Sequence, residues 1–433
     1  MKNFSLAEDQ IDRCLQIESD LLARKIGFGD SLLKGRIPWL ISPDGYQFSQ
    51  AQVQELNKIG FWAKRFLEAS VKLYQQEPSV RRILDMGKPA PVLEFQKQAL
   101  KGGQLPRLFR VDLLLMPDGT FKVGEFSLKP GGTGITAGLQ EVYRGKMVGR
   151  GILDCYKRLL DEGGKSLLIA VAQEKNRSLN EFEGLSFMLK RDGYQCRCGY
   201  PEDNKVIDGD AFYNYLPPRT WLQYRDFLNQ AVQRSKTMIP PTYVFLKEKA
   251  LFGLFWEAHW EKWWAAELGQ EGFCFLKDKL IETAIFDHRG KFSLPDHELS
   301  FKELLELTTS QRARYLVKLS GFSHGSSGAK GVVLGKEVGR TNWQQVVKQA
   351  KESFSRQIGL YVLQPFITSQ KVPVNWLDWN ESGIKTEQRY LRVLAYYFVF
   401  DDMPVLAGVE VNSSDRSKVH LQTDVTSVPG ILT

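Results

Sequence analysis

Apolar and polar residues follow two different periods along this chain, and the periods divide it into segments. Over residues 6–26 and 50–75 the apolar residues recur every three to four positions, which predicts two packing helices. Residues 108–116 and 120–128 are apolar, β-branched runs joined by a Pro-Asp-Gly turn, which predicts an antiparallel hairpin. We therefore expect a mostly helical first hundred residues, followed by a region that begins with paired strands.

The next part of the chain has the pattern of a small α/β unit. We expect one helix over residues 135–160, ended by Gly163 and Gly164. Residues 166–173 form a nearly continuous apolar run that suits a buried parallel strand, and a helix is expected over 179–190. A further strand over 212–215 and a helix over 221–232 would complete this unit.

A helix that begins near residue 247 carries aromatic side chains at a spacing of three and four. Such a stripe forms either protein core or a platform for stacking a ligand, and core is the more frequent use. We expect irregular structure over 267–300 and helices over 301–308 and 342–358. A short strand is expected over 315–318, further strands over 360–367 and 405–411, and a long strand over 389–400.

Composition is ordinary for a folded protein of several domains. The 433 residues are 43% hydrophobic and 25% charged, and 58 basic residues against 50 acidic ones give a net charge of +8. The basic residues are scattered, which suits an anionic ligand; a nucleic-acid partner is disfavoured because no recognisable binding module is present. The odd cysteine count and the lone Cys196-x-Cys198 pair favour reduced thiols over a zinc site. No signal peptide or apolar span is evident, so we expect a cytoplasmic protein without a membrane partner.

Two acidic residues are placed symmetrically in the predicted hairpin. Asp112 and Glu125 lie on opposite strands at similar distances from the turn, so their carboxylates can come side by side. A hard divalent cation such as Mg2+ would offset their repulsion. The alternative is a solvated hairpin with two surface acids, and the hairpin alone does not decide between them.

A second group of polar residues follows the strand that contains Lys318. Four glycines interleaved with three serines form a loop whose N–H groups can close over phosphates, although a mobile surface loop has the same composition. The loop matches neither G-x-x-x-x-G-K-[ST] nor G-x-G-x-x-G. Arg389, Arg392 and Arg416 lie on or beside the last strands, either as ligand-binding groups or as half-exposed strand residues.

These motifs together resemble the ATP-grasp superfamily. Its R-x-D then E-x-N-x-x-P-G signature is matched here by Arg110, Asp112, Glu125, Pro130 and Gly131. The resemblance implies Mg2+ ligands at Asp112, Glu125 and Ser127, and a catalytic Arg110 near the reacting group. Ser127 stands where the family has asparagine, and a serine hydroxyl is a poorer Mg2+ ligand.

The resemblance also implies an ATP site in the second half of the chain. Residues 318–331 look like the phosphate-covering loop, residues 363–366 look like the adenine-binding hinge, and Arg392 resembles an arginine that meets the phosphates. The implied ATP-binding residues are Lys249, Lys318, Ser323, Gly325, Ser326, Ser327, Gly328, Gly331, Gln364, Phe366 and Arg392, of which Arg392 is also implied to be catalytic.

The order of the motifs is unusual, because the metal hairpin precedes the nucleotide loop by about two hundred residues. This order is similar to that of glutathionylspermidine synthases and circularly permuted ATP-grasp proteins. The implied fold is mixed α+β and α/β, with two α+β lobes gripping ATP. The expected divisions are a helical region (1–105), a metal-binding hairpin and helix (106–163), a small α/β domain (164–240) and the nucleotide-binding lobes (241–433).

The activity implied by the resemblance is ATP-dependent ligation of a small-molecule carboxylate to an amine through an acyl phosphate. A small-molecule kinase and a nucleotide-binding protein without turnover are the alternatives, the latter because of Ser127. A nucleic-acid-binding module is a distant fourth. The identity of the acid and the amine, the role of the helical region and the oligomeric state are not encoded in any motif.

Overall fold

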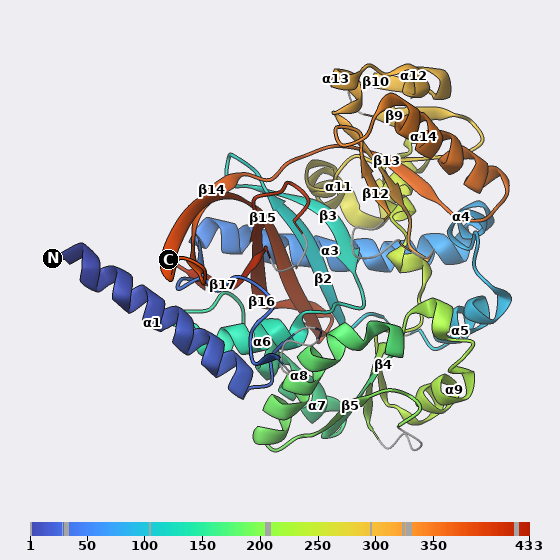
Figure 1. The fold of residues 1–433 in the computed structure, drawn as a ribbon. Coiled ribbons are helices and arrows are strands. Elements are labelled where there is room, and N and C mark those ends of the chain that lie inside the picture. The colour runs from blue at the N-terminus through green and yellow to red at the C-terminus, as the bar shows by residue number, and fades with distance from the viewer. Residues whose placement is uncertain are drawn as a thin grey trace.

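The computed structural model describes residues 2–27, 29, 34–103, 105–203, 209–294, 297–322, 325, 331–419 and 424–433. Within these ranges the strands form four sheets, which helices surround (Figure 1). The architecture is mixed α/β, as expected from the alternating periods of the sequence.

The largest sheet combines strands from both ends of the chain. Its strand order is β1-β17-β16-β15-β2-β3, and β14 pairs with β15. The strands are β1 (Tyr46–Phe48), β2 (Leu108–Leu115), β3 (Phe121–Ser127), β14 (Lys371–Asp378), β15 (Gly383–Phe400), β16 (Met403–Ser414) and β17 (Thr426–Leu432). The predicted hairpin is confirmed as β2 and β3, with Asp112 directly opposite Glu125. The central strand β15 pairs with β2 on one side and β16 on the other.

The first hundred residues form α1 (Lys2–Ala23), α3 (Gln50–Gln76), α4 (Pro78–Leu84) and α5 (Ala90–Lys101), so the helical prediction for 6–26 and 50–75 is confirmed. Of these helices, α1 and α3 contact the largest sheet, whereas α5 packs into the core of the small parallel sheet described below. A capping box of Ser49 and Gln52 begins α3. Tyr397 of β15 donates a hydrogen bond from its hydroxyl to the carbonyl of Leu56 (2.7 Å), which fixes α3 on the sheet. Figure 1 shows α3 crossing behind the strands.

The single helix predicted over 135–160 is wrong. Two helices are present instead, α6 (Thr133–Val142) and α7 (Ile152–Gly163). The segment between them contains Gly145, Gly149 and Gly151, whose φ angles are 110°, 94° and 108°. Such left-handed φ values do not occur inside a right-handed helix, so the helix cannot continue through them.

A separate four-stranded sheet is parallel throughout and has the order β5-β4-β6-β7. Its elements are β4 (Ser166–Val171), η1 (Gln173–Ser178), α8 (Leu179–Arg191), β5 (Gln195–Gly199), β6 (Ala211–Tyr215), η2 (Pro218–Thr220), α9 (Arg225–Arg234) and β7 (Thr237–Ile239). The predicted strands and the helix over 179–190 are confirmed. The helix expected from residue 221 begins only at Arg225, because Pro218 starts a short 3-10 turn before it.

The third sheet has four strands in the order β12-β11-β13-β8, and β9 and β10 form the fourth sheet, an antiparallel pair. This part of the chain comprises η3 (Phe245–Lys247), α10 (Ala250–Trp256), η4 (Ala258–Trp260), α11 (Glu261–Lys279), β8 (Ala284–Ile285), β9 (Lys291–Leu294), β10 (His297–Ser300), α12 (Phe301–Glu306), α13 (Thr309–Arg312), β11 (Tyr315–Leu319), β12 (Val332–Leu334), α14 (Arg340–Ser355) and β13 (Tyr361–Pro365).

Two predictions for this region have opposite outcomes. Irregular structure over 267–300 is wrong, since α11 continues to Lys279 across a non-helical residue, Gly269. The aromatic stripe is confirmed as core: Phe255 and Trp264 are fully buried, and Trp264 stacks on Phe66 of α3 at a centroid distance of 5.0 Å. The stripe therefore joins the helical region to the third sheet.

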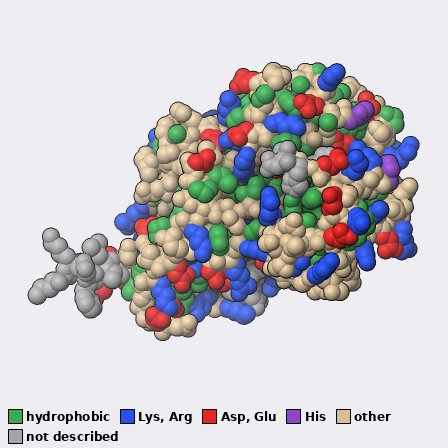
Figure 2. Space-filling model, turned by 90° about the horizontal axis from the view of Figure 1, so that it is seen from above, with side chains coloured by type: hydrophobic (Ala, Val, Ile, Leu, Met, Phe, Trp, Pro, Cys, Tyr) green, Lys and Arg blue, Asp and Glu red, His purple; other side chains and the backbone are tan. Residues whose placement is uncertain are grey.

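All five cysteines are described and are free thiols. Lys and Arg side chains are interspersed with Asp and Glu on the face shown in Figure 2. Across the described ranges, no helix has both the length and the apolar character needed to cross a membrane.

Candidate active site

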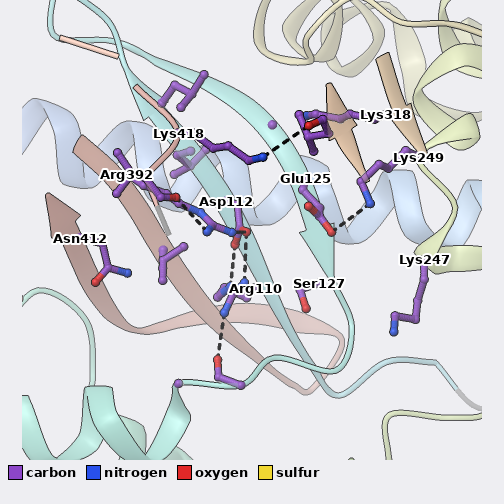
Figure 3. A pocket seen from close by; sticks show the side chains of 18 of the residues that line it. Arg110, Asp112, Glu125, Ser127, Lys247, Lys249, Lys318, Arg392, Asn412 and Lys418 are labelled. Carbon is purple, nitrogen blue, oxygen red and sulfur yellow. Dashed lines mark hydrogen bonds and ion pairs between the residues drawn. The ribbon is translucent and has the colours of Figure 1, made fainter. Parts of the chain in front are cut away.

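A cavity of about 500 Å3 lies where the main sheet, the third sheet and the small parallel sheet meet. Strands β2, β3, β15 and β16 contribute one wall, β11 and β13 a second, and residues after β4 and β6 a third. Figure 3 shows side chains from these strands converging on the same space. The cavity therefore collects residues from segments that are distant in sequence.

The hairpin presents four polar side chains to this cavity. Arg110 and Asp112 are two residues apart on β2, and Ser127 and Glu125 are their partners on β3. Because side chains alternate between the faces of a strand, this spacing places all four on the face that lines the cavity. The sequence prediction that Asp112 and Glu125 lie side by side is thus confirmed.

Asp112 is held between two arginines. Arg110 donates from Nε to Oδ1 (2.6 Å) and from Nη2 to Oδ2 (3.1 Å), and Arg392 of β15 donates from Nη2 to Oδ2. Burial raises the pKa of the Asp112 carboxyl, but the two guanidinium charges outweigh burial and lower it to about 2. Asp112 is therefore an ionised anchor that fixes both arginines in the cavity wall.

Two lysines face the same wall from the other side. Lys249 lies 3.6 Å from a carboxylate oxygen of Glu125. Figure 3 marks this ion pair with a dashed line. Lys318 projects from β11, and no hydrogen bond or ion pair holds its ammonium group within the described ranges. Burial lowers the pKa of Lys318 to about 8, with the Glu125 charge acting against this decrease. Lys249, Lys318 and Arg392 thus provide cationic groups around one space.

The predicted adenine hinge also lines the cavity. Gln364 on β13 is buried, and its Nε2 donates to the hydroxyl of Thr283 (2.7 Å). Its carbonyl oxygen Oε1 is buried with no hydrogen-bond partner in the described structure. A buried acceptor without a donor is costly, so this atom marks a position where a ligand N–H group would be stabilised. Phe366 lies beside it on the cavity wall.

The glycine-rich loop is only partly covered by the structure. Gly321 and Phe322 line the cavity, whereas Gly325 and Gly331, which were predicted to bind ATP, are described but do not line it. The other loop residues predicted to bind ATP lie outside the described residues, namely Ser323, Ser326, Ser327 and Gly328.

The root of this loop is held by a buried carboxylate, Glu248. Its oxygens accept hydrogen bonds from the hydroxyl of Ser320 and from the backbone N–H of Phe322 (3.1 Å). Lys88, just after α4, forms an ion pair with Glu248 at 2.7 Å, and the side chains are 0% and 3% exposed. The helical region thereby fixes the position at which the glycine-rich loop starts.

Only one of the three arginines noted near the C-terminus contributes to the cavity. Arg389 is buried and donates to Glu387 (2.7 Å) and to backbone carbonyls. Arg416 has a side chain that is 71% exposed. Arg389 and Arg392 are three residues apart on β15, so they point to opposite faces of the sheet and only Arg392 reaches Asp112.

The loop between β3 and α6 is fixed at three successive residues. Tyr213 donates to the carbonyl of Pro130 (2.6 Å), Arg110 donates to the carbonyl of Gly131 (2.9 Å), and the N–H of Gly132 donates to Glu181. Gly132 has a φ of 90°, and a Cβ there would lie 2.3 Å from the Tyr396 hydroxyl oxygen. Close packing of this loop therefore requires glycine at position 132.

Glu181 is a buried acid at the edge of the cavity. Burial raises its pKa to about 8, the N–H of Gly132 acts against the increase, and the neighbouring Glu410 adds to it. The carboxyl group is therefore largely protonated at pH 7.

Several lining residues were not predicted from the sequence. Three of them are lysines: Lys129 and Lys247 lie next to predicted motifs, and Lys175 follows a parallel strand, a position where ligands commonly bind. The fourth is Asn412, which with Glu410 forms an E-x-N pattern on β16. That pattern could have indicated both residues, since side chains two apart on a strand share a face.

The carboxylate oxygens of the hairpin suit a hard cation, but arginine N–H groups already occupy several of their acceptor positions. A carboxylate offers about four acceptor positions; Asp112 uses three of them for arginine N–H groups, and Glu125 is 40% exposed toward the cavity. Asn412 adds a buried amide oxygen without a partner in the described structure. No group of three or more His, Cys, Asp or Glu side chains that could hold a metal ion occurs among the described residues.

Comparison with known proteins supports the fold. No family model and no curated protein matches the sequence. A glutathione synthetase-like effector from Globodera pallida, solved in its apo form, is similar in structure with a TM-score of 0.56 and 11% identity over 98% of this chain and 96% of that chain. A γ-glutamylcysteine synthetase-like protein from Methylobacillus flagellatus aligns over 85% of this chain and 88% of that chain, with 11% identity and a TM-score of 0.39. The first similarity shows that this chain has a glutathione synthetase-like fold.

Proposed function

We propose that this protein is an ATP-dependent ligase of the permuted ATP-grasp type, which joins a carboxylate to an amine through an acyl phosphate. One observation carries the proposal: a single cavity contains the Arg110–Asp112–Arg392 cluster, the cations Lys249 and Lys318, and the unpaired buried acceptor of Gln364. The cationic side chains could bind the phosphates of a nucleotide, and the carbonyl oxygen of Gln364 could accept a hydrogen bond from its base.

The resemblance and the fold support the same proposal. The R-x-D and Glu125 positions of the motif line the cavity together with the strand lysine that precedes the glycine-rich loop. Asp112 and Arg392 are 280 residues apart in sequence yet bonded, as expected if the metal hairpin and the nucleotide lobes form one permuted unit. The similar structure named above is itself described as glutathione synthetase-like.

In the proposed reaction, ATP phosphorylates the substrate carboxylate and the amine displaces the phosphate. The protein positions the reactants and neutralises charge. Lys249, Lys318 and Arg392 would hold the phosphate chain, Arg110 would face the transferred group, and the carbonyl oxygen of Gln364 would accept from the adenine amino group. Phe322, at the start of the loop, would help to exclude water from the acyl phosphate.

Magnesium is the metal that this donor set would bind, through Glu125 and the remaining acceptor position of Asp112. A bound Mg2+ would supply positive charge for the transferred phosphoryl group. Ser127 offers a weaker ligand than the asparagine of the family pattern. The proposal therefore assigns the metal to the hairpin, with Glu125 as its principal protein ligand.

The second candidate function is nucleotide binding without turnover. It is favoured because both carboxylate oxygens of Asp112 already accept hydrogen bonds from guanidinium groups. The presence of Ser127, a weaker Mg2+ ligand than asparagine, favours it as well. A kinase with the same fold would differ from the ligase only in leaving the phosphate on its acceptor.

Product analysis with ATP, Mg2+ and pools of small carboxylates and amines tests the proposal. We expect ADP and free phosphate in equal amounts, dependent on both an acid and an amine. Glu125→Gln is expected to reduce the rate by about 100-fold or more, the typical effect of removing one group that stabilises transition-state charge. The control is Glu352→Gln, whose side chain is 64% exposed on α14 and is not among the residues that line the cavity.

Three outcomes contradict the ligase. Phosphate that remains on the acceptor indicates a kinase. Nucleotide binding without ADP formation for any pair indicates a binding protein. An unchanged rate in Glu125→Gln, with unaltered melting temperature, removes the proposed role of the hairpin.

A further inference from the structure

We propose that Lys129, Lys175 and Lys247 form a binding site for additional carboxylates of the substrate, so that the acid this protein uses is a small polycarboxylate. The inference rests on the proposed function for the statement that one carboxylate of the substrate is activated. The binding site itself is defined by the residues that line the cavity. None of the three lysines belongs to the proposed nucleotide or metal residues.

The three lysines come from different segments and line the same cavity. Lys129 lies in the loop after β3, Lys175 in η1 after the parallel strand β4, and Lys247 in η3. Figure 3 shows Lys247 on the Ser127 side of Glu125, away from Arg392. Lys247 is therefore at a different end of the cavity from Arg392. We call Lys129, Lys175 and Lys247 the lysine group.

The positive charges of the lysine group are close enough to oppose one another. The charged neighbours of Lys129 are Lys247 and Lys175, which carry charges of the same sign. Burial and the charge of Lys175 lower the pKa of Lys247 to about 8, while Glu125 acts against this decrease. Each ammonium group would be stabilised by an anion placed between them.

Lys129 and Lys247 have no carboxylate ion-pair partner in the described part of the chain. The ammonium of Lys129 donates to the backbone carbonyl of Leu216 and lies 5.4 Å from the ring centroid of Trp221. Its position is thus fixed by neutral groups, which orient the charge without neutralising it. Half-buried lysines are normally paired, so an arrangement without an acid is typical of a site whose acid is the ligand.

The loop after β3 connects the lysine group to the reacting end of the cavity. Lys129 is two residues before Gly131, whose carbonyl accepts from Arg110 (2.9 Å). A substrate with one carboxylate beside Arg110 can therefore place its other carboxylates against Lys129 and Lys247. Because more than one ammonium must be neutralised, an acid with two or more carboxylates fits better than a monocarboxylate.

Binding of simple acids to the full-length protein tests this inference without any turnover. The probes are butyrate, glutarate and tricarballylate, which carry one, two and three carboxylates, measured by isothermal titration calorimetry at pH 7. We expect tricarballylate to bind at least tenfold more tightly than butyrate, and glutarate to lie between them. Equal affinities for the three acids would overturn the inference.

The double variant Lys129→Gln/Lys247→Gln is expected to lose at least tenfold in tricarballylate affinity. The control Lys262→Gln changes an exposed lysine of α11 and should leave this affinity unaltered. Affinity for AMP-PNP, a non-hydrolysable ATP analogue, should stay within twofold in all variants and also reports that the site is folded. An equal loss of AMP-PNP and tricarballylate affinity would show that these lysines hold phosphates instead, and would overturn the inference.

The two proposals fail in different ways. If tricarballylate binds as expected but no acid supports ADP formation, the ligase proposal fails and the lysine site stands. If a monocarboxylate supports ligation and the double variant is fully active with every acid, the lysine site is wrong and the ligase proposal stands.

Discussion

The buried ion pair between Lys88 and Glu248 provides the most direct test of how the helical region supports the cavity. Replacing Lys88 by Met leaves the Glu248 carboxylate buried without its cation, which typically costs about 3–5 kcal/mol. The unfolding entropy scales as about 2.1 cal/mol/K per residue. For 433 residues this is about 0.9 kcal/mol/K, so we expect Lys88→Met to lower the melting temperature by about 3–6 °C.

Differential scanning calorimetry of matched variants measures this effect. The control is Lys72→Met, because Lys72 forms an ion pair with Glu267 of the same length, 2.7 Å, but has a side chain that is 56% exposed. Exposed pairs contribute about 0–1 kcal/mol, so the control should change the melting temperature by about 1 °C or less. Equal decreases in Lys88→Met and Lys72→Met would refute the argument from burial.

A double-mutant cycle separates the pair from its surroundings. Glu248→Gln removes the carboxylate, and the variant Lys88→Met/Glu248→Gln should be more stable than the sum of the single changes predicts, because no uncompensated charge remains. Glu248 also holds Ser320 and Phe322, so both single variants should bind AMP-PNP more weakly than the parent. Strict additivity in stability would contradict the proposed coupling.

Two further predictions concern the hairpin and the helix that follows it. The pKa of Asp112 is lowered to about 2 from 3.8, so its contribution to stability is complete above pH 4 and is lost as the pH falls toward 2. The melting temperature of the parent should therefore fall more steeply over this range than that of Asp112→Asn, and parallel curves would exclude this assignment. A Cβ at Gly134 would lie 1.9 Å from the Glu181 carbonyl oxygen, so Gly134→Ala should cost about 1–3 kcal/mol by thermal denaturation. Gly383→Ala, where the nearest atom is at 3.7 Å, is the control and should change little.

Local sequence patterns predicted those helices and strands whose own residues carry a clear apolar period or a turn motif. The turn at residues 117–119 predicts the hairpin and places Asp112 near Glu125, but their direct pairing depends on a register shift between Asp112 and Leu113 that no sequence pattern indicated. The period of α3 was equally clear. The break between α6 and α7 was missed because an apolar helical period covers glycines whose φ values only the tertiary structure determines.

The site was predictable only where a motif was present. Arg392 was named from the resemblance, but its bond to Asp112 depends on pairing of β2 with β15 across most of the chain. Lys129 and Lys175 form part of no periodic or motif pattern, and they meet only because the parallel sheet packs beside the hairpin loop. Side chains gathered by tertiary packing leave no local signal in the sequence.

The pairing of β2 with β15 also affects synthesis of the protein. At a translation rate of about 5–20 residues per second, the roughly 280 residues between Asp112 and Arg392 take on the order of 15–60 s to make. Throughout that interval the nascent hairpin has one strand edge without its native neighbour, while β3 covers only the other. Chain elongation on the ribosome therefore completes the arginine–aspartate cluster only after the residues of the small parallel sheet and of β11 and β13 have emerged, and β16 follows last.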